Sequence, residues 1–186
     1  MKKKVIYLVL IVIFLTGGFF AWKVFGPGLN PPPGKYFYIS TGSNYAEVKK
    51  SLEDQQIIGS LAIFDLIAKQ AKYPRSIRPG RYEIKKGMSL YNLVRMLRSG
   101  KQSPVDLVIT KLRTVNDLAA KIAANFECDS AAMMGILDNP DSISKYGVDA
   151  NTVMTAVIPN TYSILWNSSP SRIFRKLYSE KEKFWN

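Results

Sequence analysis

Apolar positions in the middle of the chain recur with one set of spacings, which predicts repeated units of a strand, a turn and a helix. In each unit, an apolar position at the end of a short strand is followed 6, 9 and 13 residues later by apolar positions on one face of a helix. The residue three places after the strand is Gly42 in the first unit and Gly87 in the second, but Leu112 in the third. The units run over Ile39–Leu52, Ile84–Leu97 and Ile109–Ile122.

Helix start signals agree with these units. A further helix, Leu61–Lys72, is predicted between the first and second units, and Tyr73-Pro74 ends it because proline disfavours helix in the preceding residue. The first two units and this helix predict a small α/β domain of βααβα order within an α+β protein. Residues suited to N-capping stand where each helix should begin: Ser43 or Asn44, Ser60, Ser89 and Thr114.

The chain after residue 104 predicts a second, mixed α/β part, which opens with the third unit. The apolar run Val153–Ile158 has strand or loop character, and Pro159-Asn160-Thr161-Tyr162 follows it. Helices are predicted over residues 114–126, 130–137, 139–146 and 171–185.

An uncharged run near the N-terminus, Val5–Trp22, is close to the roughly 20 residues that cross the hydrocarbon core of a bilayer. A cleaved signal peptide is the competing interpretation, but the run ends in bulky aromatic residues and lacks a small-x-small cleavage site. The basic residues Lys2-Lys3-Lys4 before the run favour a cytoplasmic N-terminus. We therefore expect a single-pass protein of the plasma (inner) membrane, with the bulk of the chain extracytoplasmic or periplasmic.

The Pro/Gly-rich residues 25–35 predict a short, stiff and extended linker. The expected organisation is an anchor over residues 1–24, this linker, the βααβα domain over 36–103 and the mixed α/β part over 104–186.

Charge and composition narrow the chemistry. The formal net charge of +12 suits anionic partners such as lipid headgroups or wall polymers, and a solvated basic surface is the plainer alternative. The chain has no histidine, which excludes His-based triads and His-ligated metal sites within it. Cys128 is the one cysteine and is expected to be a small buried side chain. We predict no metal site, no cofactor and no nucleic-acid partner, because no nucleic-acid-binding motif is present and the anchor places the domain outside the cytoplasm.

Several segments resemble the membrane-bound endolytic murein transglycosylase family (YceG-like). The resemblance implies that residues 36–103 form a LysM-like, peptidoglycan-binding domain. It also implies that residues 104–186 are the N-terminal part of a transglycosylase domain, truncated at Asn186. The segments are Arg78-Pro-Gly-Arg-Tyr-Glu-Ile-x-x-Gly-Met-Ser, Leu97-Arg-Ser-Gly-Lys-Gln, Pro104-Val-Asp-Leu-Val-Ile and Pro159-Asn-Thr-Tyr162, together with the anchor.

The resemblance also implies a reaction. A lytic transglycosylase protonates the glycosidic oxygen with a carboxyl group while the sugar's own 6-hydroxyl attacks, which leaves an anhydro end. The family's proposed acid is a glutamate five residues before Pro159, where this chain has Met154, so the catalytic residue is unknown. The substrate-binding candidates are Pro159, Asn160, Thr161 and Tyr162, with a purely structural turn as the alternative.

Two functions follow from these observations. The first is the anchored front part of an endolytic lytic transglycosylase that acts on nascent peptidoglycan glycan strands beside cell-wall synthases, catalytically incomplete in this chain. The second is a non-catalytic, membrane-anchored peptidoglycan-binding or scaffold module. In both cases Arg78, Arg81 and Arg98 are the expected contacts to the wall or the membrane.

Overall fold

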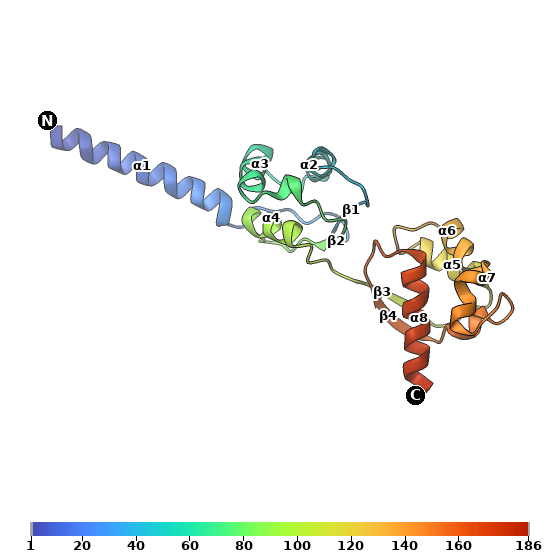
Figure 1. Ribbon diagram of the computed structural model, residues 1–186. Coiled ribbons are helices and arrows are strands. Elements are labelled where there is room, and N and C mark those ends of the chain that lie inside the picture. Colours follow the sequence, from blue (N-terminus) through green and yellow to red (C-terminus); the bar gives the residue numbers. More distant parts are fainter. Residues whose placement is uncertain (1, 186) are drawn as a thin grey trace. The chain divides into compact units, whose positions relative to one another are not determined.

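The chain folds into two compact units, residues 1–102 and 103–186, each with its own helices and two-stranded sheet (Figure 1). The computed structural model describes residues 2–185, and the side chains of residues 2–5 and 9 are outside that description. The side chains of Lys2, Lys3 and Lys4, on which the expected orientation of the N-terminus depends, therefore lie outside the described part. The combination of helices with small sheets confirms the α+β class.

Helix α1 (Lys2–Phe25) is long and apolar enough to cross a membrane. Its segment Ile6–Phe25 has 20 residues, and none of it is buried inside the protein. A helix that is apolar on all sides and exposed over most of its length is suited to lipid rather than to a soluble core.

The sheet of the first unit is antiparallel. Strand β1 (Tyr36–Ile39) pairs with β2 (Gly80–Glu83), and Phe37 lies opposite Tyr82. Both of these side chains are buried, as expected for one face of a half-buried strand. The helices of the unit are α2 (Tyr45–Asp54), α3 (Leu61–Gln70) and α4 (Leu90–Ser99), with a 3-10 helix at Tyr73–Arg75.

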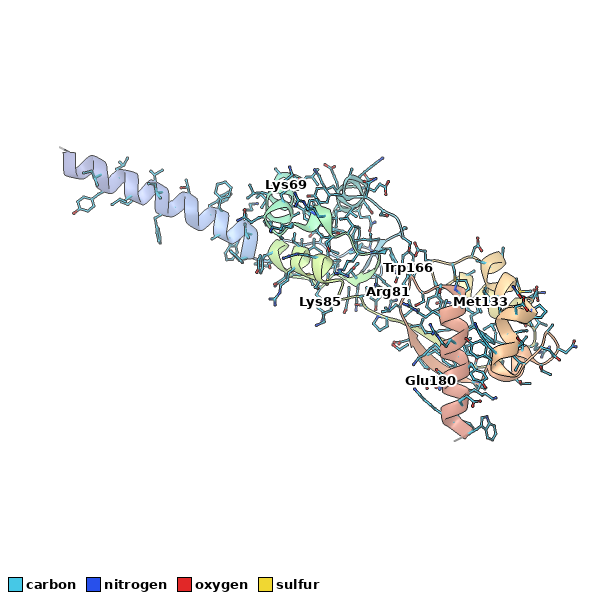
Figure 2. All side chains as sticks on the ribbon, in the orientation of Figure 1. Lys69, Arg81, Lys85, Met133, Trp166 and Glu180 are labelled. Carbon is cyan, nitrogen blue, oxygen red and sulfur yellow. The ribbon has the colours of Figure 1, made fainter. Side chains whose placement is uncertain are left out.

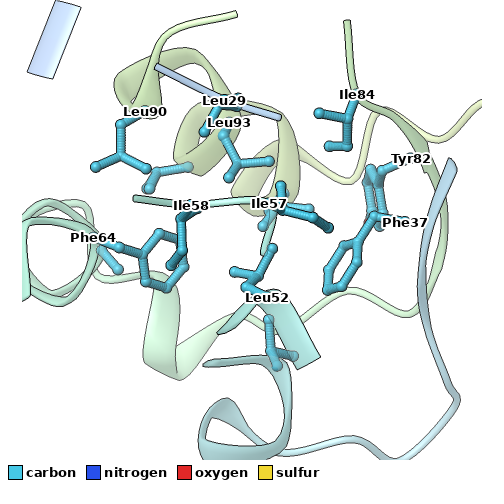
Figure 3. Packing of buried hydrophobic residues seen from close by; sticks show 14 of the residues in the cluster. Leu29, Phe37, Leu52, Ile57, Ile58, Phe64, Tyr82, Ile84, Leu90 and Leu93 are labelled. Atoms are coloured by element: carbon cyan, nitrogen blue, oxygen red, sulfur yellow. The ribbon is translucent and has the colours of Figure 1, made fainter. Parts of the chain in front are cut away.

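The predicted helix starts of the first unit are confirmed. Asn44, rather than Ser43, caps α2, and Ser60 and Ser89 cap α3 and α4. The three helices pack on the sheet around one apolar core (Figure 3). Its fully buried side chains include Phe37, Leu52, Ile57, Phe64, Tyr73, Tyr82, Leu93 and Leu97.

The segment that follows α1 is extended, as expected for residues 25–35, but it lies along the first unit. Pro27 pairs with Ser89, and Leu29 pairs with Ile58, each as an isolated antiparallel bridge. Leu29 is only 5% exposed and belongs to the core (Figure 3). The Pro/Gly-rich composition of residues 25–35 did not indicate that this segment contributes to the core, because Leu29 alone makes that contribution.

The second unit is also built on an antiparallel pair. Strand β3 (Val105–Ile109) pairs with β4 (Asn160–Ile164), and Leu107 lies opposite Tyr162. Side chains from every helix cover this pair, and Met133 lies in the resulting core (Figure 2). The helices are α5 (Val115–Ala123), α6 (Ser130–Leu137), α7 (Pro140–Ile143) and α8 (Pro170–Trp185), with 3-10 helices at Ser144–Tyr146 and Val153–Ala156.

At two places in the second unit the structure differs from a structure that the sequence left open. The apolar run Val153–Ile158 does not form a strand; it contains the 3-10 helix Val153–Ala156, whose first and last residues are buried. A spacing of three residues places these two side chains on the same side of a 3-10 helix. The segment Pro159–Tyr162 is not an isolated turn, because β4 begins at Asn160.

The two units have a related order of elements: a strand, a run of helices, a second strand antiparallel to the first, and a closing helix. The run holds α2 and α3 in the first unit, and α5, α6 and α7 in the second. In both, the second strand begins directly after a proline, Pro79 or Pro159, and the third residue after that proline is a buried tyrosine. The third strand–turn–helix unit of the sequence pattern therefore opens a second βααβα-like fold.

Candidate functional site

The Pro-Asn-Thr-Tyr segment at the start of β4 is held in place by its tyrosine. Tyr162 is 1% exposed, and its hydroxyl donates a hydrogen bond of 2.6 Å to the carbonyl oxygen of Ile158. Burial raises the pKa of the Tyr162 phenol, so the group stays protonated and keeps donating. Tyr162 therefore positions its neighbours, and its ring lies in the core rather than on the surface.

Asn160 and Thr161 are exposed beside it. The Thr161 N–H donates to the side-chain oxygen of Asn160 at 2.8 Å, which fixes the orientation of the amide. The amide nitrogen of Asn160 and the hydroxyl of Thr161 are polar groups suited to the hydroxyls and N-acetyl groups of a sugar.

A pocket of about 350 Å³ lies next to this strand start, entirely within the second unit. The loop between β3 and α5 forms one side, and the 3-10 helix with Pro159 forms the other. The pocket combines apolar walls with two exposed cationic residues, Lys111 and Arg113. Such a lining suits a ligand that has apolar ring faces and anionic substituents. The lining residues are Ile109, Thr110, Lys111, Leu112, Arg113, Met154, Val157 and Pro159.

The β3–α5 loop departs from the two corresponding loops of the first unit. After β1 and β2 the chain makes a tight turn in which Gly42 has φ +86° and Gly87 has φ +79°. Leu112 replaces that glycine, and leucine strongly disfavours positive φ. The loop instead donates the Arg113 and Thr114 backbone N–H groups to Asp117, at 3.2 and 3.0 Å.

Sequence analysis missed the loop residues Thr110, Lys111 and Arg113 as parts of the site. The available signal was the replacement of the repeated glycine by Leu112, which marks the loop that lacks the glycine turn of the other two and lines this pocket.

Met154 lines the pocket and is half-buried. It occupies the position where the resemblance implies the acid, and the eight lining residues include no carboxyl group. Asp117 and Asp149 lie within five residues of the lining residues Arg113 and Met154 in the sequence. Hydrogen bonds from Thr114 and Thr152, respectively, lower the pKa of these two carboxyls. A general acid needs a raised pKa, and neither carboxyl has one; Asp117 completes the capping box of α5, and Asp149 accepts hydrogen bonds from Asn151 and Thr152 in a turn. The described pocket therefore has binding groups and no acid.

The three arginines proposed as wall or membrane contacts divide into two sets. The Arg78 Nε donates to the carbonyl oxygen of Arg98 at 3.2 Å, so these two exposed residues lie together at the end of α4. The Arg81 guanidinium lies 4.0 Å from the centre of the Tyr36 ring, on the sheet (Figure 2). Arg78 and Arg98 form one basic site, and Arg81 packs elsewhere.

The architecture is that of a two-unit α+β protein with an N-terminal helix able to span a membrane. The sequence profile of the YceG-like family matches residues 37–186, and the chain belongs to this family.

Among solved structures, a yceG-like protein from Listeria monocytogenes is 22% identical and has a TM-score of 0.41. The similarity covers 81% of this chain and 56% of that one, so the chain spans about half the length of the Listeria protein. Among curated proteins, none shows significant sequence similarity to the chain.

Proposed function

We propose that this chain is a membrane-anchored protein of the lytic transglycosylase type that acts at peptidoglycan, and that its second unit binds glycan strands. The observation that carries the proposal is the pocket beside Pro159, with Asn160 and Thr161 exposed at its edge. Membership of the YceG-like family supports a role at the cell wall.

The proposed setting is the plasma (inner) membrane. Helix α1 crosses the bilayer once with its N-terminus in the cytoplasm, and both units lie on the extracytoplasmic side. The first unit acts as a LysM-like, peptidoglycan-binding domain, and its βααβα order supports this assignment. The partners are nascent glycan strands and the synthases that produce them.

In this proposal each part of the pocket has a task. A sugar ring rests against Leu112, Met154 and Pro159, while the Asn160 amide and the Thr161 hydroxyl bind its polar substituents. Lys111 and Arg113 attract the carboxylates of the strand, since both are exposed cations at the rim.

A second candidate is a non-catalytic peptidoglycan-binding or scaffold module. The observation in its favour is the side chain of Met154, because a thioether cannot protonate a glycosidic oxygen. The two candidates share the binding step and differ in whether binding serves cleavage of the strand; in neither does Met154 supply the acid.

Binding is tested with the full chain in detergent and purified, insoluble peptidoglycan. A double variant, Asn160→Ala with Thr161→Ala, should bind about ten-fold more weakly, since each neutral hydrogen bond contributes about 0.5–1.5 kcal/mol. Asn125→Ala is the matched control, because Asn125 is an exposed amide beyond the C-terminal end of α5. Equal binding by the double variant and the control would refute the proposed glycan site.

Cleavage is tested by incubating the chain with glycan strands and measuring anhydro-muropeptides by mass spectrometry. We expect binding without release of anhydro ends from residues 1–186. Release by these residues would overturn the assignment of Met154 as a binding residue in place of an acid. It would also exclude the scaffold candidate.

A further inference from the structure

The end of α1 is rigidly joined to the first unit. Val24 packs against the core of that unit, and the Phe25 ring lies 5.3 Å from the Tyr91 ring of α4, measured between centroids. The Gly26 N–H donates to the Trp22 carbonyl oxygen at 2.8 Å, so the helical hydrogen bonding continues to Gly26. The extended residues 27–29 that follow, and that pair with the first unit, are called the strap below. A Cβ at position 26 would overlap that carbonyl oxygen.

No free chain separates the helix from the folded unit. Pro27 is already paired with Ser89, only two residues after Phe25. Two extended residues reach at most about 7 Å. The headgroup layer on each side of a bilayer is about 6 Å thick, taking half the difference between its total and hydrocarbon thickness. Residues beside Pro27 are therefore held at the depth of the headgroups when α1 spans the membrane.

The side chains around this junction have the composition of a lipid-contacting surface. Trp22, Phe25 and Tyr91 are 66%, 64% and 42% exposed, and aromatic side chains favour the membrane interface. Lys23 and Lys86 are exposed as well. Lys86 lines the same shallow depression as Pro27 and Gly28, which places it beside the segment that leaves the helix.

We propose that the face formed by Trp22, Lys23, Phe25, Lys86 and Tyr91 binds the headgroups of anionic phospholipids. The inference rests on the part of the proposed function that inserts α1 into the membrane. The lysines pair with lipid phosphates, and the aromatic rings enter the headgroup layer beside them. The first unit then sits directly on the membrane in a fixed orientation.

This face is distinct from the Arg78–Arg98 site. Tyr91 is at the N-terminal end of α4, and Arg98 is at its C-terminal end. The seven intervening steps of helix span about 10 Å along the axis. One end of α4 therefore belongs to the membrane face, which leaves Arg78 and Arg98 for contacts with the wall.

The test measures exposure of single sites in lipid nanodiscs. A polarity-sensitive fluorophore is attached to Tyr91→Cys or, as the matched control at the other end of α4, to Ser99→Cys. Both carry Cys128→Ser, and each variant is checked for folding by circular dichroism. The full chain is reconstituted in discs of phosphatidylcholine alone or with phosphatidylglycerol, and the neutral quencher acrylamide is added.

In discs with phosphatidylglycerol, we expect quenching at position 91 to be lower than at position 99 by about three-fold or more. Lys23→Ser with Lys86→Ser should weaken the protection to the level in phosphatidylcholine discs, and salt should weaken it too. Equal quenching at positions 91 and 99, in protein that co-elutes with the discs, would overturn the proposed lipid-binding face but not the membrane anchor. Equal protection in phosphatidylcholine discs would overturn the anionic selectivity. Failure of the chain to co-elute would overturn the membrane anchor of the proposed function, while the peptidoglycan assay would still report on the glycan site.

Discussion

The hydroxyl of Tyr162 and the carbonyl oxygen of Ile158, four residues apart, form a hydrogen bond of 2.6 Å across the proline that precedes β4. The first unit repeats this bond, since Tyr82 donates to the carbonyl oxygen of Arg78 at 2.8 Å across Pro79. In both units a buried tyrosine thus secures the entrance to the second strand. The Pro-x-x-Tyr motif carries much of the family resemblance, and in both units its tyrosine has a structural role. In the second unit this motif also holds Asn160 and Thr161, between the proline and the tyrosine, at the surface.

Removing the hydroxyl of Tyr162 should destabilise the start of β4 without leaving a cavity in the core. Tyr162→Phe keeps the ring and leaves the Ile158 carbonyl without its donor, so we expect a loss of about 1 kcal/mol in the free energy of unfolding. Urea denaturation of the second unit measures this loss. Peptidoglycan binding should fall as well, because Asn160 and Thr161 depend on the tyrosine for their position. Unchanged stability and binding would show that the bond holds nothing in place.

Gly100 should not tolerate a side chain. It closes α4 with φ +70°, and an added Cβ would overlap the Arg78 side chain. Gly100→Ala should destabilise the first unit by about 1–2 kcal/mol, the cost of a left-handed conformation for an L-residue. Gly135→Ala is the control, since Gly135 lies inside α6 with no atom near its Cβ position. That change should stabilise by up to about 1 kcal/mol. Thermal unfolding of both variants compares them, and opposite signs are expected.

Asp65 should make the first unit sensitive to acid. Lys69, Lys49 and Tyr45 all donate to its carboxylate, at 2.6, 3.0 and 2.9 Å, and these hydrogen bonds lower the pKa of Asp65 in the folded state.

Because the folded pKa is depressed, the unfolded state takes up the proton first as the pH falls. The stabilisation by Asp65 is therefore complete above the unfolded pKa of about 4 and is lost as the pH falls below it. Asp65→Asn should be less stable than the wild type at neutral pH, and the two stability curves should converge in acid. Urea denaturation across this range tests the point. Asp106→Asn, on the exposed face of β3, is the control. Parallel curves for Asp65→Asn and the wild type would contradict the prediction.

Tyr82 should limit stability in alkali. Burial raises the pKa of its phenol to about 12, whereas an unfolded tyrosine ionises near 10. The stabilisation is present below pH 10 and is lost as the pH rises through 12, because the unfolded state releases the proton first. In Tyr82→Phe, titration of tyrosinate absorbance should lose a late step. If Tyr82→Phe instead removed a step near pH 10, the Tyr82 phenol would be exposed to water and the prediction would be wrong.

Spacing rules predicted the helices of both units and the strands β1, β2 and β3, because each rule reports a local preference; β4 (Asn160–Ile164) was not predicted. Asn44, Ser60, Ser89 and Thr114 cap the helices where the sequence indicated, and Gly100 ends α4 in the left-handed region. Membership of the YceG-like family is likewise confirmed. The pairing of β3 with β4 was not predictable from spacing, because about 50 residues separate strands whose partners are chosen by packing.

The candidate site was only partly predictable. Asn160 and Thr161 are indeed exposed, but Tyr162 is buried, since the sequence alone does not reveal that its hydroxyl has a backbone partner. Lys111 and Arg113 join the site through the path of a loop, which depends on the backbone conformation at Leu112. Leu29 was missed for a related reason, because it is one apolar residue within a Pro/Gly-rich segment.

The docked strap after α1 has a mechanical consequence. In the proposed setting, with α1 held in the bilayer and a later part of the chain held on the wall, the chain is stretched whenever the two move apart, and a loose linker would absorb that movement. Here the pull passes through the contacts of Val24 and Phe25 with the first unit and then into the Pro27–Ser89 and Leu29–Ile58 pairs. Because the two pairs are isolated bridges that follow each other along the chain, they are loaded in turn, Pro27 before Leu29. Opening the second pair draws Leu29 out of the core, so in the proposed setting tension between membrane and wall would unfold the first unit from its membrane side.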